Sequence, residues 1–113
     1  MTKSDQREHT FGHDEEMRFK ARGRKNKVLG LWAAGLMGKM GASAEAYACD
    51  IVMADFEMPG DHDVVQTLMH DLAAAGKSTE EYTIRRQGEH FMVETMKQVM
   101  TELKKQLASE SCC

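Results

Sequence analysis

The chain has 113 residues, a formal net charge of −3 at pH 7, and 42% hydrophobic residues. This length suffices for one domain with a core but not for a second independent domain. The longest apolar run, residues 28–38, is shorter than the roughly 20 residues that a membrane-spanning helix needs, which argues against membrane insertion. The start of the chain lacks an apolar secretory signal and the three cysteines form no disulfide framework, so we expect a cytoplasmic protein.

The composition favours an all-α fold, because Ala, Met, Leu, Glu and Lys are abundant and the sequence holds a single proline. A first helix is expected over residues 14–40, since acidic residues open it and Gly41 follows it. The second helix is expected to be capped by Ser43 and to end near Met58, because Pro59 disfavours a helical residue before it.

Two further helices are expected in the second half of the chain. Asp61 is a natural N-cap for the third, which should end at Gly76. In the fourth, Ser78 and Glu81 have the spacing of a capping box, and apolar residues then recur at helical spacing. Short connections between successive helices predict an antiparallel four-helix bundle with long first and last helices.

The apolar stripe of the first helix is narrow before Val28 and wide from Val28 to Met40. We therefore expect three parts: a flexible N-terminal arm (residues 1–13), the four-helix bundle (residues 14–108) and a disordered tail (residues 109–113). Trp32, the only tryptophan, lies on the apolar stripe and is expected to pack against the fourth helix near Phe91 or Met92.

Charge is segregated along the chain. Residues 1–39 hold nine cations and five acids, whereas residues 40–76 hold seven acids and neither Lys nor Arg. Six of the cations fall within residues 18–27. Such a segment is typical of a site for an anionic partner, and a solvated helix face explains it about equally well. Nucleic acid is the weaker choice, because the isoelectric point is near 5.9 and no DNA- or RNA-binding motif is present.

Motifs for catalysis and metal binding find little support. The stretch "AAAGKS" lacks the first glycine of a phosphate-binding P-loop and the strand before it. The five histidines show no helical zinc spacing, and Cys49 lies mid-helix, where a small buried residue is expected. We expect no enzyme activity, no catalytic residue, no metal site and no required cofactor.

Several stretches taken in order resemble one known family: "HDEEMRFKARGRKNKVLGLWAAGLMG", "AYACDIVMADFEMPGDHDV" and "TIRRQ". Over about residues 7–105 the chain is similar to the zeta subunits, small inhibitors of the ATP synthase of alphaproteobacteria. The resemblance implies a four-helix bundle whose N-terminal segment and first helix enter the catalytic head of the F-type ATP synthase and block ATP hydrolysis. It also implies a weak site for ADP or ATP on the bundle.

The partner is thus expected to be the head, formed by alpha, beta and gamma subunits, which would hold the protein at the cytoplasmic face of the membrane. The free protein is expected to be a monomer that binds no nucleic acid. Apolar anchors and the side chains around them are the expected partner-binding residues: Phe11, His13, Met17, Arg18, Phe19, Lys20, Arg22 and Arg24.

The alternative function is a helical bundle that senses adenine nucleotides and inhibits little or not at all. In that case an exposed aromatic ring would stack on the adenine. Guanidinium and ammonium groups would hold the phosphates, and the candidates are Arg22, Arg24, Lys25, Arg85 and Arg86.

Overall fold

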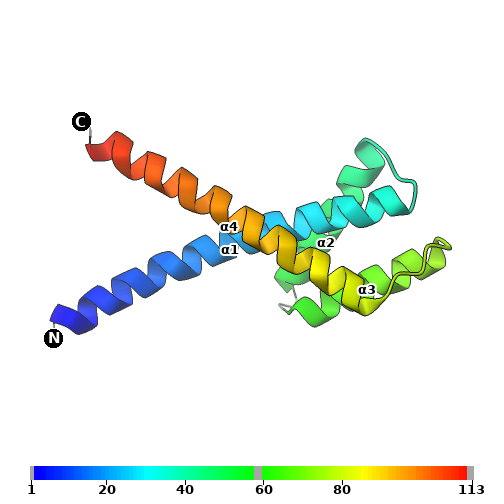
Figure 1. Cartoon of the computed structure of the whole chain (residues 1–113), viewed down its shortest axis with the longest axis horizontal. Helices are drawn as coiled ribbons and strands as arrows, with labels where there is room; N and C mark the ends of the chain where they lie inside the picture. Colours follow the sequence, from blue (N-terminus) through cyan, green and yellow to red (C-terminus); the bar gives the residue numbers. More distant parts are fainter. Residues whose placement is uncertain (1, 58–59, 112–113) are drawn as a thin grey trace.

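The structure, a computed structural model, describes residues 2–57 and 60–111, and the side chains of residues 15–57, 60 and 62–105. It has four helices in this part of the chain: α1 (Thr2–Leu36), α2 (Ala42–Glu57), α3 (Asp61–Ala74) and α4 (Glu81–Ser111). The predicted all-α fold with long first and last helices is confirmed (Figure 1). Across the described ranges, no helix is both long enough and apolar enough to cross a membrane.

Both ends of the first helix differ from those predicted from the sequence. It begins at Thr2 instead of residue 14, and the flexibility expected of residues 1–13 stays a prediction. It ends at Leu36, before the expected Met40, because Gly38 rather than Gly41 forms the stop. Gly38 has a φ of 84°, its N–H bonds to the Gly35 carbonyl, and the next N–H bonds to the Ala34 carbonyl, which is the pattern of a Schellman motif.

The ends of α3 and α4 can also be compared with those predicted from the sequence. Gly76 ends α3 as expected, with a φ of 75°. The N-cap of α3 is Gly60, so the predicted cap at Asp61 is wrong by one residue. The fourth helix begins at Glu81, three residues after Ser78, so the predicted capping box is wrong. At its other end α4 is helical to Ser111, beyond the expected boundary at residue 108.

The four helices do not lie side by side along their whole lengths. Figure 1 shows α1 and α4 crossing, with the N-terminal part of α1 and the C-terminal part of α4 diverging on one side of the crossing, while α2 and α3 lie on the other side. The molecule measures 55 × 31 × 22 Å, and its radius of gyration is 17.0 Å. A compact chain of this length would have a radius of about 13 Å, so the fold is elongated.

The core lies where α1 crosses the other three helices. Its centre is formed by aliphatic side chains from all four helices: Leu29, Ala33, Ile51, Val64, Val65, Leu68, Leu72 and Ile84. Trp32 and Phe91 are partly buried against this cluster. Trp32 is therefore partly buried against the core, and its expected contact with Phe91 or Met92 stays a prediction.

Small residues decide which face of α1 is buried. A Cβ atom added at Gly30 would lie 2.9 Å from the Cα of Ala48, so the backbones of α1 and α2 touch here. This contact turns Val28 outward, 38% exposed, although the apolar stripe placed it inside. Met40 is 82% exposed and Cys49 is also exposed, so the burial expected of both is wrong.

Candidate functional site

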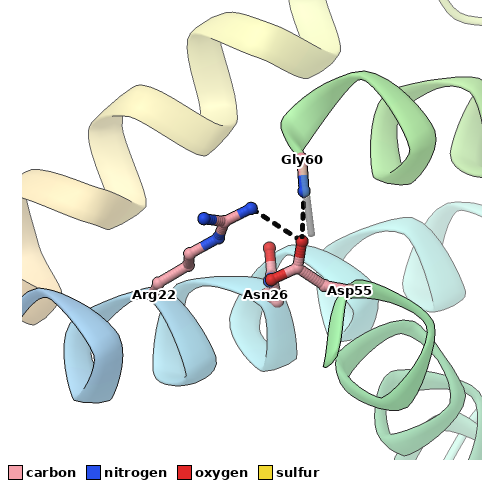
Figure 2. A network of polar contacts seen from close by, with 4 residues as sticks. All are labelled: Arg22, Asn26, Asp55 and Gly60. Atoms are coloured by element: carbon pink, nitrogen blue, oxygen red, sulfur yellow. Dashed lines mark hydrogen bonds and ion pairs between the residues drawn. The ribbon is translucent and has the colours of Figure 1, made fainter. Parts of the chain in front are cut away.

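The basic segment of α1 is held by an acidic residue at the end of α2. Arg22 Nη2 donates to Asp55 Oδ1 at 2.9 Å, and Asn26 Nδ2 donates to Asp55 Oδ2 at 2.8 Å (Figure 2). The backbone N–H of Gly60, at the start of α3, donates to Asp55 Oδ1 at 3.3 Å. We name these four residues the Asp55 clasp. It ties α1 to the end of α2 and to the start of α3.

Burial makes the clasp strong. Asp55 is only 8% exposed and Asn26 only 1%. A buried carboxylate is costly unless donors satisfy its oxygens, and here an ionised donor, an amide and a backbone N–H do so. The clasp therefore fixes α1 before Val28, although the apolar stripe of the helix is still narrow there.

A second ion pair joins the diverging parts of α1 and α4. Arg24 forms a two-pronged contact with Glu102, and its Nη2 lies 2.6 Å from Oε1. The hydrogen bond from Arg24 holds the pKa of Glu102 below its ordinary value, and the same bond raises the pKa of Arg24. Both side chains are open to solvent, so this pair contributes far less to stability than the Asp55 clasp.

The remaining cations of the basic segment differ in their surroundings. Lys20 Nζ lies 3.8 Å from Glu16 and Lys27 Nζ lies 3.4 Å from Glu45 of α2. Lys25 is buried, with 6% exposure. Arg18 is exposed and forms no ion pair with a described side chain. Much of the positive charge of the basic segment is thus paired with acidic side chains of the same chain.

A groove of about 510 Å³ runs between α1 and α4, and we call it the α1–α4 groove. Its floor is apolar and includes Leu29, Val65 and Ile84. Its rim carries charges of both signs, with four cations (Arg18, Arg22, Lys25 and Arg85) and two acids (Glu15 and Glu89). The cations outnumber the acids, so the groove suits a ligand that has both an apolar part and a negative charge. Such a ligand would compete for Arg22 with Asp55 and for Arg85 with Glu81, which lies 3.3 Å from it.

The predicted nucleotide-binding residues divide between this groove and other places. Arg22, Lys25 and Arg85 line it, and Phe19 adds an aromatic ring. Arg24 instead pairs with Glu102. Arg86 lies on another face of α4, where its Nη1 is 3.2 Å from the hydroxyl of Tyr82.

The predicted partner-binding residues follow the part of α1 that leaves the crossing. Arg18, Phe19 and Lys20 are exposed, and Met17 is half-buried. The side chains of Phe11 and His13 lie outside the described residues. Arg22 and Arg24 are paired with acids of other helices, whereas Lys20 has only a 3.8 Å contact with Glu16 of its own helix, so Arg18 and Lys20 are the cations most open to another molecule.

Phe56 of α2 is a surface residue that the sequence analysis did not single out. Its ring packs edge-to-face against that of Phe19, with centroids 6.3 Å apart and an interplanar angle of 71°. Yet Phe19 is 64% and Phe56 67% exposed. No local sequence signal marks Phe56 as exposed, because its exposure depends on how α2 is rotated against α1.

The chain is similar to known proteins in both sequence and structure. A model of the protein family described as ATPase inhibitor subunit zeta matches residues 1–98. A structure solved by NMR in solution is 41% identical, with a TM-score of 0.65, over 76% of this chain and 98% of that chain. None of the curated proteins compared with the chain matches it. The family match spans the basic segment, the Asp55 clasp and the α1–α4 groove.

Proposed function

Because this chain belongs to the ATPase inhibitor subunit zeta family, we propose that it restrains ATP hydrolysis by docking on the catalytic head of the F-type ATP synthase. Residues 1–20 dock among the alpha, beta and gamma subunits, and the rest of the fold holds them in place. The proposal is carried by one observation: α1 leaves the crossing with exposed cations and an exposed aromatic ring at Arg18, Phe19 and Lys20.

The chemistry of this segment suits a protein surface. Met17 and Phe19 supply apolar area, and the neighbouring Arg18 and Lys20 supply charge that would meet acidic groups. The Asp55 clasp at Arg22 sets the direction in which the segment projects. A segment lodged between subunits would oppose the subunit movements on which turnover depends, which accounts for inhibition without any catalytic residue.

Removal of residues 1–16 tests this assignment. The clasp and the core lie after residue 20, so the shortened chain should keep its far-UV circular dichroism signal per helical residue. It should lose the ability to inhibit the isolated ATPase. Full inhibition by the shortened chain would contradict docking through the first segment.

The α1–α4 groove favours a second candidate function, the binding of an adenine nucleotide. In this proposal Phe19 would stack on the base, and Arg22, Lys25 and Arg85, which line the groove, would bind the phosphates. Arg85 lines the groove and its neighbour Arg86 does not, so the two form a matched pair.

Titration of ATP against isotopically labelled protein separates these roles. Amide shifts should appear around the groove, and Arg85→Ala should weaken binding whereas Arg86→Ala should not. The absence of shifts at millimolar ATP would exclude the nucleotide site. Equal effects of the two substitutions would place it elsewhere.

A further inference from the structure

An exposed aromatic patch lies where α1 leaves the crossing. Phe19 of α1 and Phe56 of α2 are each about two-thirds exposed, and Met53, one turn before Phe56, is 55% exposed. Large apolar side chains gathered from two helices and left in solvent are typical of protein-binding surfaces. Aromatic side chains are also among the residues that most often dominate binding energy.

The Asp55 clasp holds the α2 part of the patch in place. Phe56 directly follows Asp55, whose carboxylate is held by Arg22 and Asn26 of α1. The edge-to-face contact then fixes the two rings relative to each other. A preformed anchor loses little conformational entropy on binding, so its burial would translate efficiently into affinity.

We propose that Phe56, together with Phe19, forms one aromatic anchor that enters an apolar recess on the catalytic head of the ATP synthase. This inference rests on the proposed function and extends the docking surface from α1 to α2. Arg18 and Lys20 flank Phe19, whereas Glu57 adjoins Phe56. The recess therefore carries carboxylates on the side that faces α1 and not on the side that faces α2.

The test measures the affinity of the full-length chain for the isolated catalytic head. The variants are Phe19→Ala, Phe56→Ala and the double variant, and Tyr82→Ala of α4 is the matched control because Tyr82 is also 67% exposed. Phe56→Ala should weaken binding about tenfold, which corresponds to about 1.4 kcal/mol, and Tyr82→Ala should leave it unchanged. The double variant should lose less than the product of the two single losses, because both rings occupy one recess.

Each outcome separates the anchor from the underlying docking model. Wild-type affinity of Phe56→Ala, combined with weaker binding by Phe19→Ala, would overturn the two-helix anchor and leave docking through α1 standing. If the wild-type chain itself does not bind the head, the proposed function fails along with the anchor. Thermal unfolding of each variant checks the fold, and Phe56→Lys provides a second variant whose charge should oppose entry into the recess even more strongly.

Discussion

Asp55 is the side chain on which the placement of the basic segment depends most. Its oxygens accept hydrogen bonds from three donors, one each from Arg22, Asn26 and Gly60. Removing one partner of a buried ionic contact leaves the others unsatisfied, and this costs more than the contact itself contributes. Glu102 makes a similar contact with Arg24, but both of these side chains are exposed to solvent.

These two acids give a matched pair of substitutions. Asp55→Ala should lower the free energy of unfolding by about 2–4 kcal/mol, because the buried amide of Asn26 and the half-buried guanidinium of Arg22 would lose their acceptor. Glu102→Ala should have a much smaller effect, because water replaces its contact with Arg24. Urea unfolding followed by circular dichroism measures both, and equal losses would contradict the assigned difference in burial.

Between helices, the contact of α1 with α2 is set by the small residues Gly30 and Ala48. Their backbones approach so closely that no side chain fits at position 30. Gly23 lies on the same helix, and nothing lies within 4 Å of a Cβ atom added there. The two glycines therefore have opposite consequences for stability.

Gly30→Ala should destabilise the protein by about 1–3 kcal/mol, because the new methyl group forces α1 and α2 apart. Gly23→Ala should stabilise it by about 0.5–1 kcal/mol, because alanine has the higher helix propensity and meets no neighbour. Differential scanning calorimetry of the two variants checks the signs. Stabilisation by Gly30→Ala would show that the backbones do not touch.

Local sequence signals predicted the number of helices well and some helix ends poorly. Gly76 was recognisable as a stop because glycine readily takes the positive φ with which many helices end, and it does so after α3. The sequence offers two glycines, Gly38 and Gly41, and both take positive φ in the structure. The presence of a glycine therefore could not tell which one ends α1. The capping box at Ser78 failed because the spacing of Ser and Glu does not fix where α4 begins.

The candidate site was predictable in part. The cluster of cations was visible in the sequence, but their partners were not. Arg22 and Asp55 are 33 residues apart, and Arg24 and Glu102 are 78 residues apart. Phe56 escaped notice because its exposure depends on how α2 is rotated against α1. Long-range pairing and helix rotation come from tertiary packing, which periodicity along one helix does not encode.

For the protein as a whole, backbone rigidity should increase in steps along α1. The clasp at Arg22 and the core at Leu29 should give rigid backbone amides from about Ala21 onward. Before about residue 12 we expect low order parameters, because "MTKSDQREHTFG" holds too little apolar surface to offset the cost of ordering. Amide relaxation of the free protein measures this profile. Uniform rigidity from Thr2 onward would contradict a flexible arm.

For the whole assembly, we propose that the chain inhibits ATP hydrolysis by the catalytic head of the ATP synthase. The most direct measurement is a titration of the full-length protein into the isolated head, with the rate of ATP hydrolysis followed at each concentration. The rate should fall and then level off as the protein binds. A rate that stays constant up to a large molar excess of the protein would contradict inhibition at the head.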